Sequence, residues 1–202
     1  MNPHDFNYVF KHYAPRTEEK MREVLMSPNS PGPTFHYYMI RGGKDQKNIT
    51  VWEPGTVDRE YIKAYGHYHV GTIDETYRVL MGNGVALLQK LAVDQEGKMI
   101  PDVVEEFKAI VVHPGDEVYM PPAYGHLFAN TGETYLVTSD NSPVDFEEKD
   151  PASLPGHADY EPVRIMHGFA YYVVEHDGKP ALTKNGRYKE IRKEDFGGLA
   201  VV

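Results

Sequence analysis

The chain has 202 residues, of which 41% are hydrophobic and 25% charged, a balance typical of a globular domain. Its formal net charge of −9 excludes the broad positive surface with which proteins hold nucleic-acid backbones, so we expect no nucleic-acid partner. Because it contains no cysteine, disulfides, thiolate nucleophiles and thiolate metal ligands are excluded, and histidine and carboxylate side chains remain as candidate ligands.

The N-terminal segment lacks the basic and apolar pattern of a secretory signal, and no stretch approaches the roughly 20 apolar residues of a membrane-spanning helix. We therefore expect a cytoplasmic protein with no membrane partner. Residues 17–26 combine an acidic first turn with a proline shortly after their end, which predicts one short amphipathic helix.

Beyond this helix, short segments rich in tyrosine, valine, isoleucine and threonine predict strands, with glycine and proline turn signals between them. The predicted strands cover residues 35–41, 48–53, 76–81, 84–91, 107–112, 135–139 and 171–175. Many strands with little helix between them indicate an all-β antiparallel barrel or jelly roll.

The predicted strands resume after residues 141–155, so we interpret that polar, acidic, proline-bearing segment as a long surface loop and not as a domain linker. We therefore predict a single domain over residues 1–202. It consists of an N-terminal arm and helix (1–32), the barrel with its peripheral strands (33–180) and a C-terminal tail (181–202).

Four residues form a candidate metal site. His67 and His69 are two positions apart, which on a strand places both imidazoles on one face. Glu75 opens the next predicted strand, and His126 follows a turn-rich segment that leads to a later one. Three imidazoles and one carboxylate suit Fe²⁺, Mn²⁺, Ni²⁺, Co²⁺ or Zn²⁺ better than Mg²⁺ or Ca²⁺, which prefer oxygen ligands.

The framework around these residues resembles the two sequence motifs of the cupins, which implies a cupin (jelly-roll) β-barrel. The first motif is matched by His67, His69, Glu75 and Gly82, and the second by Gly115, Pro121, His126 and Asn130. Ala123 stands where the second motif has glycine, and the spacing between His69 and Glu75 is slightly longer than usual.

From about residue 33 to residue 169, the chain more closely resembles the cupin-type glucose-6-phosphate isomerases. The matching landmarks are residues 50–55, 66–69, 75–77, 114–116, 119–122, 156–160 and 168–169. The Gly156-His157-Ala158-Asp159-Tyr160 element is the most informative of these, because cupins in general lack it.

This resemblance implies the reversible conversion of glucose 6-phosphate to fructose 6-phosphate, with one divalent metal ion per subunit, Fe²⁺ being the expected ion. It implies that Glu75 is the base that moves a proton between C1 and C2, while His157 is a second acid or base or assists ring opening. Tyr77 shares the strand face of Glu75 and is a further catalytic candidate. Contacts to the sugar phosphate are expected from Thr50, Gly66 and Tyr160. A metal-assisted hydride shift is the alternative mechanism.

The chain departs from this family at the phosphate end of the pocket. Phe35, Ala64 and Asp140 stand where hydroxyl-bearing residues are usual, which leaves Lys63 or Arg78 as possible charge partners of the phosphate. The substrate is therefore either a hexose phosphate or another aldose or ketose.

Two rival functions also remain, an Fe(II) cupin dioxygenase and a non-catalytic sugar-binding cupin. Cupins of this size commonly pair, so we expect a homodimer.

Overall fold

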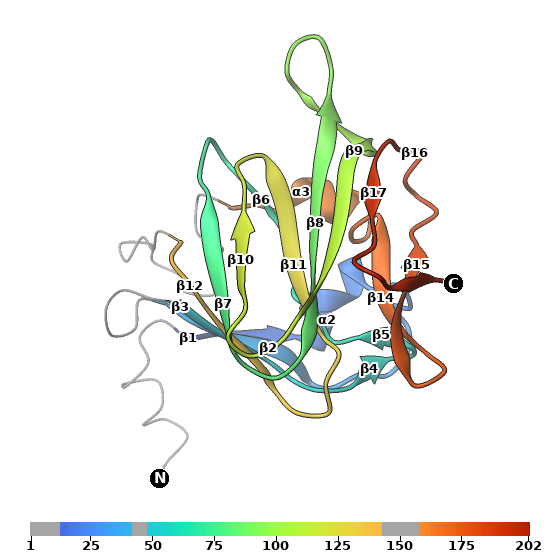
Figure 1. Ribbon diagram of the computed structural model, residues 1–202. Coiled ribbons are helices and arrows are strands. Elements are labelled where there is room, and N and C mark those ends of the chain that lie inside the picture. The colour runs from blue at the N-terminus through green and yellow to red at the C-terminus, as the bar shows by residue number, and fades with distance from the viewer. Residues whose placement is uncertain (1–12, 42–47, 143–157) are drawn as a thin grey trace.

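The computed structural model describes residues 13–41, 48–142 and 158–202, and strands dominate these ranges (Figure 1). The described helices are short, namely α2 (Glu18–Met21), the 3-10 turn η1 (Arg22–Val24) and α3 (Glu161–Ile165). None of them has the length and hydrophobicity needed to cross a bilayer. The predicted all-β class is confirmed.

One side of the barrel is a six-stranded antiparallel sheet. In spatial order it contains β1 (Tyr13–Thr17), β2 (Phe35–Ile40), β3 (Asn48–Trp52), β12 (Leu136–Asp140), β7 (Glu75–Met81) and β10 (Glu117–Met120). Along β3 and β12 every second side chain is buried, as expected for strands with one face on the core. The buried side chains of this sheet include Thr50 of β3, Glu75 and Tyr77 of β7, and Asp140 of β12.

The opposite side is a second sheet, ordered β11 (Tyr124–Asn130), β8 (Gly84–Val93), β9 (Met99–Val112) and β16 (Glu190–Ile191), with β17 (Glu194–Asp195) also beside β9. The Phe128 ring on β11 lies 5.7 Å from that of Trp52 on β3 and 5.0 Å from that of Tyr77 on β7. The two sheets therefore pack face to face around an aromatic core. The β8–β9 hairpin extends beyond this body (Figure 1).

Smaller sheets cover the barrel. One pairs β6 (Tyr68–His69) with β13 (Ala158–Asp159), and the other is ordered β18 (Ala200–Val201), β15 (Lys179–Lys184), β14 (Tyr171–His176), β5 (Glu60–Tyr61) and β4 (Thr56–Val57). Gln89 on β8 connects these layers. Its amide nitrogen lies 2.6 Å from the Tyr68 hydroxyl and 2.9 Å from that of Tyr188, and its oxygen accepts from the Ala170 amide.

Several segments differ from the sequence expectation, and the strands β1, β10 and β11 are not predicted by it. The helix predicted over residues 17–26 is shorter, because Thr17 still belongs to β1 and caps α2, accepting from the Lys20 amide. The strand predicted over residues 107–112 is only the second half of β9, which begins at Met99. The predicted tail contains the end of β15 and all of β16, β17 and β18. Most of the loop predicted over residues 141–155 lies outside the described residues.

Candidate metal centre

His67, His69, Glu75 and His126 come together at one point, where each offers a ligand atom and these atoms all lie within 4.8 Å of one another. His67 and His126 face each other across an isolated antiparallel bridge, in which the His126 amide donates to the His67 carbonyl at 3.0 Å. His69 follows on β6 and Glu75 opens β7. The cluster thus joins residues 67–75 with His126, which follows Glu75 by 51 positions in the sequence.

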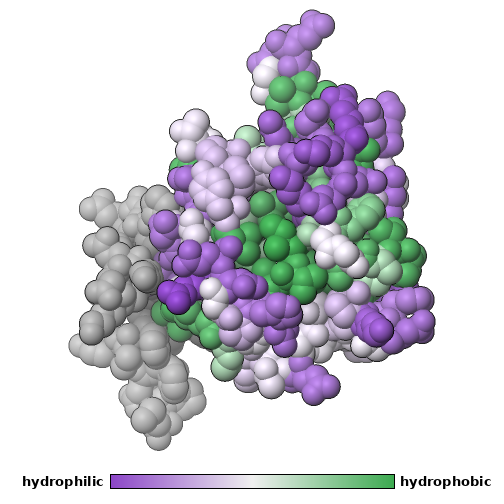
Figure 2. Space-filling view, in the orientation of Figure 1, coloured by the Kyte–Doolittle hydropathy of each residue, from purple (hydrophilic) through white to green (hydrophobic). Residues whose placement is uncertain are grey.

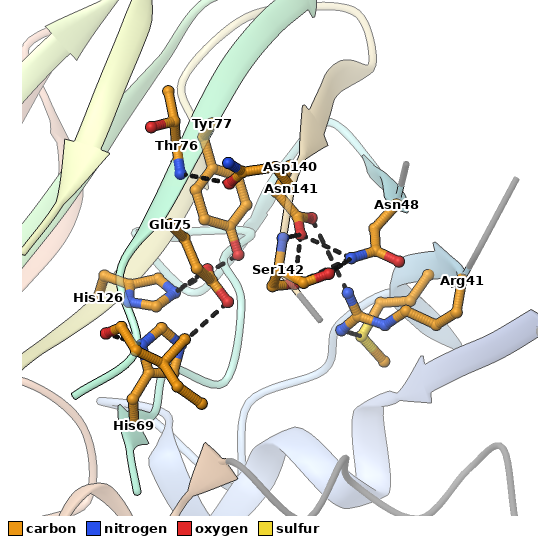
Figure 3. Close-up of polar contacts among 12 residues, drawn as sticks. Arg41, Asn48, His69, Glu75, Thr76, Tyr77, His126, Asp140, Asn141 and Ser142 are labelled. Carbon is orange, nitrogen blue, oxygen red and sulfur yellow. Dashed lines mark hydrogen bonds and ion pairs between the residues drawn. The ribbon is translucent and has the colours of Figure 1, made fainter. Parts of the chain in front are cut away.

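The Glu75 carboxylate lies between two imidazoles (Figure 3). Its Oε1 is 2.9 Å from His69 Nε2 and its Oε2 is 3.3 Å from His126 Nε2, and all three side chains are buried. Burial by itself raises the pKa of Glu75, but hydrogen bonds from His126 and His69 outweigh it and hold this pKa well below its usual range. Glu75 therefore carries a negative charge.

The orientation of the imidazoles suits metal binding. His69 Nδ1 lies 3.1 Å from the Ile73 carbonyl, which can only accept, so Nδ1 carries a hydrogen and Nε2 is the ring nitrogen that faces Glu75. Burial lowers the pKa of His69, but its hydrogen bond with Glu75 outweighs burial and raises this pKa, and a metal ion that binds at Nε2 displaces the proton held there. Burial and the nearby His126 lower the pKa of His67 well below its usual value, which favours the neutral, ligating form. The donor set fits one divalent transition metal.

A cavity that is partly open to solvent lies beside this cluster. The three substrate residues expected from the sequence, Thr50, Gly66 and Tyr160, all line it. Gly66 has φ +84°, and a Cβ there would lie 2.9 Å from the Phe169 ring, so only glycine fits this wall. The Tyr77 hydroxyl, also at the wall, lies 3.4 Å from His126 Nε2.

Other residues of the cavity wall are not predicted from the sequence, among them Tyr37 and Met39 of β2 and Arg41, which directly follows β2. Their spacing of two residues puts them on one strand face, and this alternation is the signal that identifies them. The sequence predicts only a strand over residues 35–41, because aromatic and apolar side chains usually serve packing.

The charge partners expected for a phosphate lie elsewhere. Lys63 is buried and donates to the Val24 carbonyl at 2.8 Å, and its ammonium lies 3.5 Å from the Glu60 carboxylate. Arg78 is exposed on β7, and neither residue lines the cavity. The expectation that they hold phosphate is therefore wrong. His157 lies outside the described residues.

Asp140 is a buried carboxylate held by several groups (Figure 3). Its Oδ1 accepts from the Asn48 side chain at 2.7 Å and from the Ser142 amide at 3.1 Å, and its Oδ2 lies 3.9 Å from Arg41 Nη1. Of the other two departures from the family pattern, Ala64 lines the cavity, whereas Phe35 is 37% exposed and does not.

Comparison of the sequence with known proteins points to one enzyme family. The family model for glucose-6-phosphate isomerase (GPI) matches residues 37–190. The chain is 32% identical to the glucose-6-phosphate isomerase of Pyrococcus furiosus over 86% of this chain and 82% of that protein. The chain is 29% identical to the Pyrococcus abyssi enzyme, over 85% of this chain and 81% of that protein. It is 34% identical to the Thermococcus kodakarensis enzyme, over 70% of this chain and 63% of that protein. The chain therefore belongs to the glucose-6-phosphate isomerase family.

Proposed function

We propose that this protein interconverts glucose 6-phosphate and fructose 6-phosphate by a metal-assisted proton transfer between C1 and C2 of the open-chain sugar. The observation that carries the proposal is the buried cluster of three histidines and one glutamate, which borders a cavity in a chain of this enzyme family. The proposal also treats the chain as a single cupin domain that acts in the cytoplasm, since the reaction is a step of glycolysis.

The four clustered residues, His67, His69, Glu75 and His126, would hold one divalent ion per subunit. Fe²⁺ is the proposed ion, and Mn²⁺, Ni²⁺, Co²⁺ and Zn²⁺ suit the same donors. When bound, the ion would supply a Lewis acid that stabilises negative charge on the substrate oxygens. The depressed pKa of Glu75 and of His67 supports this role, because each side chain then has the protonation state that binds metals.

Glu75 is the proposed proton carrier. Its buried carboxylate is ionised and can accept a proton from a sugar carbon brought to the cluster, giving a cis-enediolate, and can return that proton to the neighbouring carbon. A base placed in this way typically contributes about 10²–10⁴ in rate. Tyr77 stays neutral, because burial raises the pKa of its hydroxyl well above the usual value, so it can donate to a substrate oxygen.

The remaining roles rest on position and on the family resemblance. The Thr50 hydroxyl, the Gly66 backbone and the Tyr160 side chain are proposed substrate contacts, supported by their places in the cavity wall. His157 is proposed as a second acid or base, or as the group that assists ring opening, on the resemblance alone.

The test measures formation of glucose 6-phosphate from fructose 6-phosphate by the purified protein, before and after treatment with a chelator. Activity is expected to disappear on chelation and to return when Fe²⁺, Mn²⁺, Ni²⁺, Co²⁺ or Zn²⁺ is restored. Glu75→Gln is expected to lower kcat by at least about 10²-fold, because the amide cannot carry the proton. The matched control Glu117→Gln changes an exposed glutamate of the neighbouring strand β10 and is expected to keep full activity.

A rate that survives both chelation and Glu75→Gln would overturn the proposal. Activity on other phosphorylated or unphosphorylated sugars, but not on fructose 6-phosphate, would favour an isomerase of different substrate. Oxygen uptake without isomerisation would favour the Fe(II) dioxygenase, which the same donor set supports.

A further inference from the structure

Lys63 and Glu60 of β5 form a buried ion pair that takes no part in the proposed reaction. Their side chains are 2% and 0% exposed, and the Lys63 ammonium lies 3.5 Å from Glu60 Oε1. Neither residue lines the cavity. Bringing two charges out of water is costly, so apolar residues of similar volume often stabilise a fold equally well. The contacts of the pair, rather than its contribution to stability, therefore indicate its role.

Both members of the pair hold the segment formed by residues 22–26, which contains η1. Lys63 Nζ donates to the Val24 carbonyl at 2.8 Å, and the Met26 amide donates to Glu60 Oε2 at 2.7 Å. Val24 is the last residue of η1, where carbonyl groups have no partner within the helix. Segment 22–26 is thus fixed by two charge-assisted hydrogen bonds.

The chain that carries Lys63 leads directly into the cavity wall and the metal cluster. Lys63 forms an isolated antiparallel bridge with β11, and the amide of the next residue, Ala64, donates to the Phe128 carbonyl at 2.8 Å. Ala64 and Gly66 line the cavity, and His67 belongs to the metal cluster. The ion pair therefore connects segment 22–26 with this wall.

Segment 22–26 also contacts the part of the chain that carries Tyr160. Tyr160 is the N-cap residue of α3, and its carbonyl accepts from the Arg164 amide at 3.0 Å. η1 and α3 contact each other, and a Cβ at Gly168, shortly after α3, would lie 3.1 Å from the Val24 carbonyl oxygen. The segment thus lies between the Lys63–Glu60 pair and the helix that begins after Tyr160.

We propose that the Lys63–Glu60 pair positions Tyr160 for substrate binding, acting through segment 22–26 and α3. This inference rests on the proposed function, in which Tyr160 contacts the substrate, and deepens it. The Tyr160 ring lies 5.4 Å from the Tyr65 ring and 5.2 Å from the His67 ring, so a shift of α3 changes its place beside the metal cluster. Charged hydrogen bonds are directional and fix one arrangement of these parts, whereas apolar contacts are not directional.

The test compares the metal-loaded wild-type protein with the double variant Glu60→Gln/Lys63→Met and the exposed control Lys90→Met. The double variant removes both charges together, and its amide can still accept from Met26. It is expected to fold and to keep its metal, but to raise KM for fructose 6-phosphate about 10-fold with kcat changed much less. Lys90→Met should match the wild type.

Two further measurements distinguish positioning from a general loss of stability. Tyr160→Ala should raise KM in the wild type but add little in the double variant, because both changes then affect the same contact. Amide hydrogen exchange in α3, measured without substrate, should be faster in the double variant than in the wild type and the control.

An unchanged KM in a folded double variant would overturn the proposal, and so would a loss confined to kcat. It would also fail if the effects of Tyr160→Ala and the double variant on KM were independent, because the pair would then not act through Tyr160. If the double variant does not fold, Glu60→Gln alone decides, and unchanged KM and exchange in α3 contradict the proposal. A wild-type protein without isomerase activity would overturn the proposed function alone, because exchange in α3 still tests the ion pair.

Discussion

Ala123 has a backbone conformation that glycine usually supplies. It lies in the turn between β10 and β11, just before the strand that carries His126, and its φ is +67°. In this left-handed region the Cβ of an L-residue crowds the backbone. We predict that Ala123→Gly raises the free energy of unfolding by about 1 kcal/mol, since relief of strain exceeds the entropy that glycine adds to the unfolded chain. Urea unfolding measures this change.

Gly82, the glycine of the first motif, provides the opposite control. It has φ +83°, and a Cβ there would lie only 2.3 Å from the Tyr135 carbonyl oxygen. Gly82→Ala should therefore destabilise the protein strongly. If Ala123→Gly lowered stability as well, strain at Ala123 would be the wrong explanation of its conformation.

At the scale of single residues, the metal cluster was predictable and Arg41 at the cavity wall was not. Two histidines at a spacing of two define a strand face by themselves, so His67 and His69 could be paired without a structure. Arg41 acquires its environment from Asp140, which follows it by 99 positions in the printed sequence and lies on another strand of the sheet. No local pattern contains that information, because it depends on strand register.

At the scale of elements, β8 is buried along nearly its whole length because layers cover both of its faces. Gln89 is the polar group at this junction, and it contacts Tyr68, Tyr188 and the Ala170 amide. We predict that Gln89→Leu lowers the free energy of unfolding by about 2–3 kcal/mol, because it leaves buried polar groups without partners. Chemical denaturation followed by tryptophan fluorescence tests this, since Trp52 is the one tryptophan of the chain.

The matched control is Gln95→Leu, which makes the same change at an exposed position after β8 and is expected to have little effect. Equal stabilities of the two variants would show that the Gln89 contacts do not stabilise the junction.

Strands rich in apolar, aromatic and β-branched residues were the elements that the sequence predicted well. The predicted strands over residues 35–41, 48–53 and 84–91 correspond to β2, β3 and β8 within two residues at each end. The first half of β9 is not predicted, because residues 102–106 are acidic or β-branched and show no regular spacing of apolar residues. β11 is not predicted because it begins with Tyr-Gly-His, which does not resemble a strand. Their strand structure comes from pairing with β8, across a hairpin for β9 and over 34 to 46 positions of the sequence for β11.

At the scale of the whole molecule, His36 should make stability depend on pH. It is fully buried on β2, and neither ring nitrogen has a hydrogen-bond partner among the described residues. Burial, with the charge of nearby Lys63, lowers the pKa of His36 to about 4. Below the unfolded value of about 6.5, the unfolded chain therefore binds a proton that the folded chain does not, and stability falls as the pH decreases toward 4.

From this pKa we predict a loss of about 2 kcal/mol in the free energy of unfolding between pH 7 and pH 5 that is due to His36. The variant His36→Phe keeps a buried ring and should show a shallower dependence on pH. The exposed control His113→Gln should keep the wild-type dependence. A slope that is the same in all three proteins would exclude His36 as the source.

The assembly state is the last prediction. Exposed apolar side chains remain on the described strands, among them Leu80 and Met81 of β7 and Val111 of β9, which are 46%, 47% and 38% exposed. Figure 2 shows hydrophobic residues gathered at the centre of one face, within a border of hydrophilic ones. Such a patch favours association, and two-fold pairing is the commonest form. We therefore predict a homodimer, with a light-scattering mass twice the 23.0 kDa of one chain. A mass of one chain at every concentration would contradict it.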